Sequence, residues 1–341
     1  MNIFDINPDI TRAETLSSEF YTDKRYFHES KEKIFARTWQ MLATADEINN
    51  LKPFTILENF LEEPILITKN GENLNCLSNV CTHRGKILIE NECKASGIRC
   101  GYHGRRFDLE GKFLSMPEFE NAKNFPSEKD NLPEIPFEIW NNFLFASINP
   151  IAPLGEFLRE VSALQNVQNL RFYSAKDYEV KAHWALYCEN YLEGFHVPFV
   201  HQALNQAIDY GSYSTETFRY SSLQKGFDPS GEIAAQYFFI FPNLMLNFYP
   251  WGLSVNIVKP LKPELTKISY LTFVSDESKL NCGAGADLET VEFEDQKVVE
   301  SVQKGISSRF YERGRYSPNR EQGTHHFHGL ITEFMNGFET K

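Results

Sequence analysis

Two short segments of this 341-residue chain each combine one cysteine with one histidine. The first contains Cys81 and His83, and the second contains Cys100 and His103. A structural zinc site usually takes both cysteines from one loop and both histidines from another element, because four ligands must surround a single ion. A two-iron, two-sulfide cluster with two thiolates on one iron and two imidazoles on the other suits two facing loops that each supply one residue of either type. These four residues are therefore expected to bind a [2Fe-2S] cluster, with a structural zinc site as the alternative.

The residues around the second pair extend this interpretation to a family. Residues 100–108 read Cys-Gly-Tyr-His-Gly-Arg-Arg-Phe-Asp. They resemble the second cluster loop of the Rieske non-haem iron oxygenases, in particular of the branch with choline monooxygenase and the glycine betaine and carnitine oxygenases. The resemblance covers nearly the whole chain. It implies the large (alpha) subunit of an oxidoreductase, a monooxygenase or a dioxygenase, with one Rieske [2Fe-2S] cluster and one mononuclear Fe(II) per subunit and O2 as co-substrate.

Residues 189–201 are similar to the family's segment that carries a bridging carboxylate and two iron-binding histidines. The resemblance assigns His196 and His201 to the mononuclear iron, and Glu193 to electron transfer between subunits. Glu193 and His196 are three residues apart and would share one face of a helix, but His201 would lie roughly 140° around an unbroken helix from His196. Pro198 is expected to bend the helix and bring both imidazoles together. Two neighbours, Asn190 and Tyr191, are expected either to support the ligands through direct contacts or simply to pack within the helix.

A facial site for non-haem iron also needs one carboxylate. Residues 288–307 are expected to form a helix with apolar residues at helical spacing, and Asp295 lies on its apolar face. A carboxylate that faces a protein core is unfavourable unless it is paired or bound to a metal, so Asp295 is either the third ligand or a member of a buried salt bridge. The family resemblance also selects Asp295 as the ligand. Three further acidic residues of this helix can point to solvent instead: Glu292, Glu294 and Glu300.

The pattern of the whole chain predicts an α+β protein with two domains. Short β-rich runs around the hairpin signal Asn70-Gly71 predict a small all-β domain that carries the cluster. The Rieske [2Fe-2S] domain is expected at residues 40–148, and the catalytic domain with the mononuclear iron at residues 1–39 and 149–341. For the catalytic domain, the resemblance implies a START-like helix-grip fold with a curved antiparallel sheet wrapped by helices.

Composition limits the classes of partner. The net charge of −12 argues against nucleic-acid binding, which requires a basic surface. The sequence has no run of 18 or more apolar residues, so no membrane-spanning helix is expected, and the first residues lack the pattern of a signal peptide. A cytoplasmic protein without a membrane partner is therefore expected. The remaining cysteines are expected to be free thiols: Cys76, Cys93, Cys188 and Cys282.

Two aromatic or histidine-rich segments remain. Residues 247–252 are rich in aromatic rings, which attract quaternary ammonium groups with roughly 0.5–2 kcal/mol each. Three of them are candidates for the substrate pocket, either as a cation-binding cage or as ordinary packing residues: Phe248, Tyr249 and Trp251. Near the C-terminus, adjacent histidines on an extended segment would point apart, so a structural or pocket role without a metal is expected for His325, His326 and His328.

The chain shows no flavin or nicotinamide motif, and a Rieske cluster carries only one electron, so electrons must come from outside. A separate reductase or ferredoxin that uses NAD(P)H is the expected partner, and the family implies a homotrimer or a multiple of it. The expected function is to hydroxylate or oxidatively N-demethylate a small organic substrate, with a quaternary amine as the favoured class. The alternatives are an aromatic-ring hydroxylating dioxygenase of the same family, a Rieske electron carrier, and a zinc-stabilised ligand-binding protein.

Overall fold

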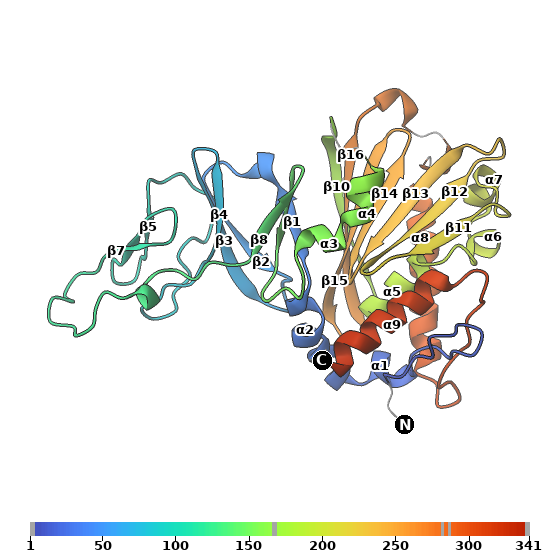
Figure 1. Cartoon of the computed structure of the whole chain (residues 1–341), viewed down its shortest axis with the longest axis horizontal. Helices are drawn as coiled ribbons and strands as arrows, with labels where there is room; N and C mark the ends of the chain where they lie inside the picture. The colour runs from blue at the N-terminus through green and yellow to red at the C-terminus, as the bar shows by residue number, and fades with distance from the viewer. Residues whose placement is uncertain (1–3, 166–168, 281–282, 286–287, 338–341) are drawn as a thin grey trace. The chain divides into compact units, whose positions relative to one another are not determined.

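Figure 1 shows a computed structural model of the chain. The structure describes residues 4–165, 169–280, 283–285 and 288–337. The chain divides into two compact units. We call Ala36–Ile151 the β unit, and Met1–Phe35 together with Ala152–Lys341 the α+β unit.

The described part of the β unit contains the strands β1 (Gln40–Thr44), β2 (Leu51–Ile56), β3 (Glu63–Asn70), β4 (Asn73–Ser78), β5 (Ile98–Arg99), β6 (Arg106–Phe107), β7 (Phe113–Ser115), β8 (Phe137–Trp140) and β9 (Phe143–Ala146), with the 3-10 helices η2 (Ala45–Glu47) and η3 (Glu128–Asp130). They form antiparallel sheets with the orders β1-β9-β8, β2-β3-β4 and β5-β6-β7. The expected hairpin at Asn70-Gly71 joins β3 to β4, and Gly71 has a φ of +62°, which glycine adopts without strain.

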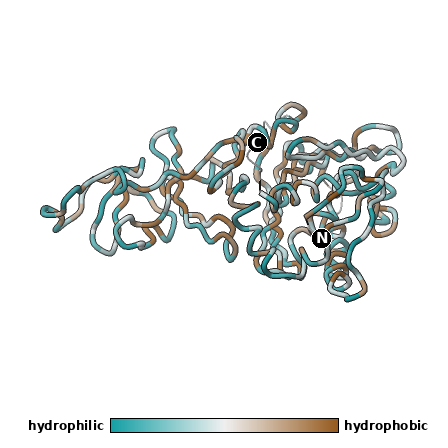
Figure 2. The backbone as a smooth tube through the Cα atoms, turned by 60° about the horizontal axis from the view of Figure 1, so that its bottom comes forward, coloured by the Kyte–Doolittle hydropathy of each residue, from teal (hydrophilic) through white to brown (hydrophobic). Residues whose placement is uncertain are grey.

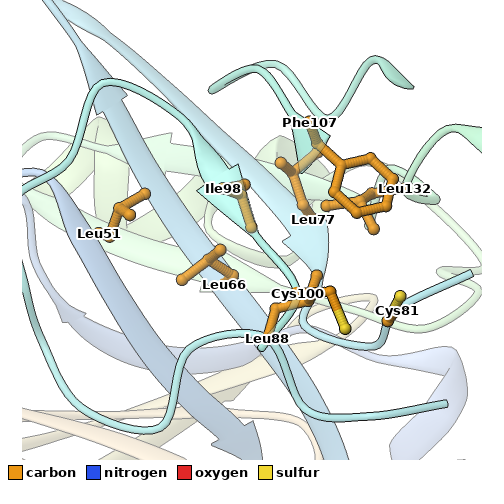
Figure 3. Packing of buried hydrophobic residues seen from close by; sticks show 9 residues of the cluster. All are labelled: Leu51, Leu66, Leu77, Cys81, Leu88, Ile98, Cys100, Phe107 and Leu132. Atoms are coloured by element: carbon orange, nitrogen blue, oxygen red, sulfur yellow. The ribbon is translucent and has the colours of Figure 1, made fainter. Parts of the chain in front are cut away.

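Buried apolar side chains of the β unit pack around the two cysteine and histidine segments. Figure 3 shows this core, in which the side chain of Cys100 lies between those of Cys81 and Leu88. Burying one large apolar side chain stabilises a fold by roughly 1.5–3 kcal/mol, so this core fixes the strands that carry both segments. The other cysteines that the structure describes, Cys76, Cys93 and Cys188, are free thiols, and Cys282 lies outside the described residues.

The described strands of the α+β unit are β10 (Arg171–Val180), β11 (Ser214–Thr217), β12 (Ser221–Phe227), β13 (Ile233–Ile240), β14 (Leu244–Tyr249), β15 (Gly252–Lys262) and β16 (Leu265–Val274). They form one antiparallel sheet in the order β10-β16-β15-β14-β13-β12-β11. The inner strand β15 is buried over most of its length, whereas the edge strand β10 is mostly exposed and carries charged residues. Charges on an edge strand protect it from pairing with other chains.

Helices cover this sheet (Figure 1). The helices of the α+β unit that the structure describes are α1 (Ser18–Thr22), α2 (Lys24–Lys33), α3 (Leu154–Phe157), α4 (Arg159–Leu164), α5 (Trp184–Tyr191), α6 (Val197–Val200), α7 (Gln202–Ala207), α8 (Leu288–Ile306) and α9 (Gln322–Asn336), with the 3-10 helices η4 (Glu277–Lys279) and η5 (Gly283–Gly285). The 3-10 helix η1 (Phe35–Arg37) spans the sequence boundary between the two units. Helix α5 packs against α8 and β15, and α8 also contacts β10. The predicted α+β class, with an antiparallel sheet wrapped by helices, is confirmed.

Hydrophobic stretches of the chain are short and alternate with hydrophilic ones (Figure 2). Among the helices of the described residues, none is long and apolar enough to span a bilayer.

Candidate functional site

The two cysteine and histidine segments of the β unit share one backbone geometry. In each loop the cysteine N–H donates to the carbonyl five residues later at 2.8 Å, and the cysteine carbonyl accepts the N–H of the glycine four residues later. These glycines, Gly85 and Gly104, have φ values of +71° and +76°, a region that favours glycine. The N–H of Tyr102 points to Sγ of Cys100 at 3.5 Å. Backbone donors near sulfur stabilise a thiolate and so suit a metal ligand.

The side chains of these loops meet at one place. The thiols of Cys81 and Cys100 are buried and hydrogen-bond to each other. The rings of His83 and His103 lie edge to face with centroids 4.7 Å apart, and Nδ1 of His83 is buried without a hydrogen-bond partner among the described residues. Paired thiols, paired imidazoles and an unsatisfied ring nitrogen fit the two-thiolate, two-imidazole ligand set of a Rieske cluster. A single metal ion fits less well, because it would need these side chains to gather closely around one point. Among the described residues, the group of three or more candidate ligand atoms that lie within 4.8 Å of one another belongs to the α+β unit instead.

Asp130 joins the two loops, through an ion pair with the buried Arg105 and through its own carbonyl. Arg105, in the second loop, is 2% exposed and contacts Oδ1 of Asp130 at 2.5 Å and the ring of Phe113 at 4.9 Å. The carbonyl of Asp130 accepts the hydroxyl of Thr82, in the first loop, at 2.9 Å, and also the guanidinium of Arg105 at 3.2 Å. Asp130 therefore holds both loops at one point.

In the α+β unit, the predicted iron-binding segment begins where α5 ends. Helix α5 ends at Tyr191, and Glu193 and His196 lie in the turn before α6, so the expectation of one helix bent by Pro198 is wrong. Pro198 instead lies in the first turn of α6, where its missing N–H is tolerated. The carboxylate of Glu193 accepts the backbone N–H groups of Phe195 and His196, and these bonds hold the turn in place of helical ones.

His196, His201 and Asp295 come together although Asp295 lies on α8. Their candidate ligand atoms all lie within 4.8 Å of one another. Oδ1 of Asp295 is 3.4 Å from Nε2 of His196 and 3.0 Å from Nε2 of His201. Asn190 donates from Nδ2 to the same oxygen at 2.7 Å. Two imidazoles and one carboxylate form the donor set of a facial non-haem iron site, which leaves positions open for other ligands.

A further carboxylate holds the other nitrogen of each imidazole. Nδ1 of His196 is 2.6 Å from Glu193, and Nδ1 of His201 is 2.7 Å from Glu294. Such pairs fix the ring and leave Nε2 for a metal. Burial alone would lower the pKa of His196, but its bonds to Asp295 and Glu193 raise that pKa to about 10. Burial alone would raise the pKa of Asp295, but its bonds to both histidines lower that pKa to about 2.

A pocket opens beside these residues. Its wall combines tyrosine rings, amides and aliphatic side chains with the carboxylates of Glu193, Glu292 and Asp295. The tyrosines and amides are Tyr187, Tyr191, Tyr213, Tyr237, Tyr249, Asn190, Asn247 and Asn256. Tyr191, a candidate to support the metal ligands, instead donates its hydroxyl to Asn247 and to the carbonyl of Phe238. The wall is therefore aromatic and acidic.

Two of the three predicted pocket aromatics lie elsewhere. Tyr249 lines the pocket, but Phe248 does not, because neighbouring residues of a strand point to opposite faces of the sheet. Phe248 packs instead against Phe238, with ring centroids 5.9 Å apart. Trp251 is buried behind Tyr249 and stacks on it at 5.0 Å.

Sequence reasoning missed one group of pocket residues. Glu292 was placed among the residues that can point to solvent, but its carboxylate accepts the hydroxyls of Tyr187, at 2.5 Å, and of Tyr270, and Asn256 donates to it at 3.5 Å. Burial, reinforced by the charge of Asp295, raises the pKa of Glu292 to about 7. That placement is also wrong for Glu294, which contacts His201, because α8 packs on both α5 and β10 and so has more than one covered face.

Polar residues within the strands could have indicated this part of the pocket from the sequence. Asn247 and Asn256 are buried polar residues within mostly apolar strands, and cross-strand pairing places Asn247 opposite Tyr237 and Asn256 opposite Tyr270. Buried polar side chains require partners, so their presence in β14 and β15 indicates a polar site on one face of the sheet.

The C-terminal histidines lie on helix α9, so the expected extended segment is wrong. Nε2 of His325 is 2.8 Å from the carbonyl of Asn7. His328 is fully buried, with Nδ1 2.6 Å from the hydroxyl of Tyr316 and Nε2 3.2 Å from Glu189. Burial lowers the pKa of His326 to about 4.

Comparison with known proteins agrees with this geometry. Residues 38–126 match the Rieske [2Fe-2S] domain, and residues 167–236 and 212–337 match the ring hydroxylating alpha subunit (catalytic domain). The chloroplastic choline monooxygenase of Arabidopsis thaliana is 28% identical, over 96% of this chain and 84% of that protein. The carnitine monooxygenase oxygenase subunit of Escherichia coli K12 is also 28% identical, over 97% of this chain and 96% of that protein.

Solved structures give the same result. The quaternary ammonium Rieske monooxygenase CntA in complex with L-carnitine superposes with a TM-score of 0.79 at 27% identity, over 96% of this chain and 97% of that one. Another structure of a quaternary ammonium Rieske monooxygenase is described as giving insight into inter-subunit electron transfer. Naphthalene 1,2-dioxygenase with bound indole shares the fold, with a TM-score of 0.74 at 17% identity over 99% of this chain and 95% of that one.

The two matched models together span the cluster loops and the histidine and aspartate site. The chain belongs to the Rieske non-haem iron oxygenases, as an oxygenase (alpha) subunit with one Rieske [2Fe-2S] cluster and one mononuclear iron.

Proposed function

We propose that this enzyme uses O2 and externally supplied electrons to hydroxylate or oxidatively N-demethylate a small quaternary ammonium compound. One observation carries the proposal: a pocket lined by five tyrosines and by carboxylates opens beside His196, His201 and Asp295. Aromatic faces attract quaternary ammonium groups by roughly 0.5–2 kcal/mol each, and nearby carboxylates add attraction for a cation. The names of the relatives, choline and carnitine monooxygenases, support the same substrate class.

We assign the cluster to Cys81, His83, Cys100 and His103, within a Rieske domain at residues 40–148. We assign the mononuclear iron to His196, His201 and Asp295, within a catalytic domain at residues 1–39 and 149–341. When bound, the cluster supplies single electrons and the mononuclear iron activates O2 for insertion into a C–H bond. A substrate hydroxylated on an N-methyl carbon would break down to an amine and an aldehyde, which gives N-demethylation.

The surrounding residues prepare the iron site. Glu193 and Glu294 hold Nδ1 of the two imidazoles, so that both Nε2 atoms face Asp295. Asn190 fixes the Asp295 carboxylate with its amide. His196 and His201 would hold the metal through unprotonated Nε2 atoms, and the carboxylates on Nδ1 would keep the rings basic.

Electrons are proposed to enter from a separate reductase or ferredoxin and to pass between subunits of a homotrimer. Glu193 contacts His196 directly, which suits a carboxylate that joins the iron site to the cluster of a neighbouring subunit. The description of inter-subunit electron transfer for a solved relative supports this arrangement.

The test is substrate-dependent oxygen uptake by the reconstituted system. The purified holoenzyme is supplied with a Rieske-system reductase and NADH, and choline, carnitine and glycine betaine are compared with aromatic acids. Oxygen uptake coupled to an oxidised ammonium product supports the proposal. Coupled turnover of the aromatic acids alone would instead support an aromatic-ring hydroxylating dioxygenase and contradict it.

A further inference from the structure

The pocket contains one carboxylate that the metal site does not use. Glu193 is bonded to His196, and Asp295 contacts both histidines. Glu292 lies one turn before Asp295 on α8, and its carboxylate accepts the hydroxyls of Tyr187 and Tyr270 and the amide of Asn256. Within the part of the chain that the structure describes, Glu292 has no ion-pair partner. It is thus a positioned acidic group at the pocket wall without a cation.

Apart from the metal-site histidines His196 and His201, the described wall of this pocket has no basic side chain that could bind a negative group. No lysine or arginine is among its described lining residues. The internal stretches outside the described ranges, residues 166–168, 281–282 and 286–287, contain neither residue type in the sequence.

The polar donors of the wall already have acceptors inside the protein. Asn190 donates to Asp295, and Asn256 donates to Glu292. The remaining donors are bonded in the same way: Tyr191 to Asn247, Tyr213 to Gln224, Asn247 to Asn256, and Tyr237 and Tyr249 to each other. A substrate carboxylate would therefore lose its hydration and gain at most the second N–H of an amide group that is already bonded, with no lysine or arginine to offset the loss.

We propose that Glu292 is the counter-ion for the ammonium group of the substrate, and that the pocket selects a singly charged cation over a zwitterion that carries its own carboxylate. The inference rests on the proposed function, in which the substrate is a quaternary ammonium compound. A carboxylate on the substrate would face Glu292 without a compensating positive side chain, and like charges at close range oppose binding. A cation without a carboxylate gains the attraction of Glu292 and of the tyrosine rings.

The first test needs no variant. Binding of glycine betaine and of glycine betaine amide to the reduced holoenzyme is measured by calorimetry under anaerobic conditions. The two compounds share the trimethylammonium group and differ only in whether the other end is a carboxylate or a neutral amide. The amide is expected to bind at least about tenfold more tightly. Equal affinities, or tighter binding of glycine betaine, would overturn the proposal.

The second test addresses Glu292 itself. Glu292→Gln keeps an oxygen that accepts from Tyr187 and Tyr270 but removes the charge. Choline is expected to bind about tenfold more weakly to this variant, and the preference for the amide over glycine betaine is expected to fall toward one. Glu289→Gln on the same helix is the control, because Glu289 pairs with Lys176 at an exposed position. That substitution should leave both affinities unchanged.

The outcomes separate the two proposals. Unchanged choline binding by a Glu292→Gln variant with normal iron content and melting temperature removes Glu292 as the counter-ion. If the variant does not fold, the comparison of the two ligands on the wild-type enzyme still decides between a cation and a zwitterion. Turnover of zwitterions in preference to choline contradicts only the inference, whereas failure of every quaternary ammonium compound to bind contradicts the proposed function as well.

Discussion

The cluster region and the iron region are built by different means. The residues assigned to the cluster come from two loops within residues 81–103, and each loop is shaped by its own backbone hydrogen bonds and a glycine with positive φ. His201 and Asp295 are 94 residues apart, and side-chain bonds from Glu193, Glu294 and Asn190 hold the iron site together. Local sequence therefore determines the first region, whereas tertiary packing determines the second.

The largest effect is expected from a substitution that removes the mononuclear iron and leaves the cluster intact. Asp295→Ala is expected to lower the iron content from about three to about two per chain and to abolish oxygenation, because the facial site loses its only assigned carboxylate. The visible absorption of the cluster should remain. Iron and sulfide analysis with absorption spectroscopy measures both, and Glu289→Ala on the same helix serves as the control. Retention of the third iron would show that Asp295 is not a ligand.

The reciprocal substitution is Cys100→Ala in the second cluster loop. Without one of two thiolates, the cluster is expected to be lost together with its absorption, while about one iron per chain remains in the α+β unit. Activity with the reductase should disappear, because electrons no longer reach the iron. Cys93→Ala, at an exposed free thiol, is the matched control. A variant that keeps the cluster spectrum would contradict the assignment of Cys100.

The side-chain support of the iron site predicts a graded effect. Glu294→Gln weakens the hold on Nδ1 of His201 without touching the ligand itself, so iron affinity is expected to fall roughly 10- to 100-fold. Competition with a chelator measures the affinity, and the cluster content is expected to stay unchanged. Unaltered iron affinity would mean that the contact between Glu294 and His201 does not support the site.

In the cluster region, Asp130→Ala tests the ion pair that joins the loops. Arg105 would then remain buried without its carboxylate partner, and the free energy of unfolding is expected to fall by about 2 kcal/mol. This is less than the roughly 3–5 kcal/mol for breaking a fully buried ion pair, because the backbone carbonyl of residue 130 still accepts a hydrogen bond from Arg105. Denaturant unfolding followed through the cluster absorption measures this loss. Glu128→Ala, at an exposed position of the same turn, should have little effect.

The same pair predicts a pH dependence. Burial alone would raise the pKa of Asp130, but its bonds to Arg105 and Ser127 lower it. Because the folded-state pKa of Asp130 lies below the ordinary value of about 3.9, the ionised carboxylate stabilises the fold fully at a pH above that ordinary value. This stabilisation is lost as the pH falls from the ordinary pKa through the lower, folded-state pKa. The Asp130→Ala variant should lack this acid-sensitive part of the stability. An identical acid profile for both proteins would contradict the role of the pair.

The contrast between local and tertiary determination explains why the cluster loops could be predicted from the sequence and parts of the iron site could not. The cluster loops have ligand spacing, glycines and turn geometry within a few residues, so a local pattern was sufficient. The turn after α5 was misread as helix because the spacing does not show that the Glu193 carboxylate accepts backbone N–H groups of the turn. It also does not show that Tyr213 packs on the turn, where a Cβ on Gly194 would lie 2.7 Å from its ring. Glu292 was misplaced for the same reason, since its orientation depends on the hydroxyls of Tyr187 and Tyr270 on other elements.

The smallest expected effect lies in the pocket wall, where the iron region recognises its substrate. Tyr249→Leu removes a ring that lines the pocket, so choline is expected to bind roughly 2- to 30-fold more weakly, as the loss of one cation–π contact implies. Tyr249→Phe removes only the hydroxyl that bonds to Tyr237 and should leave the affinity nearly unchanged.

Calorimetry with choline and with its uncharged carbon isostere, 3,3-dimethylbutan-1-ol, separates the two contributions of the Tyr249 ring. A cation–π contact predicts that Tyr249→Leu weakens choline more than the isostere, because only choline carries the charge that the ring attracts. An equal loss for both ligands would mean that the ring contributes apolar contact alone. Charge recognition in this pocket would then depend on the carboxylate of Glu292 rather than on the ring of Tyr249.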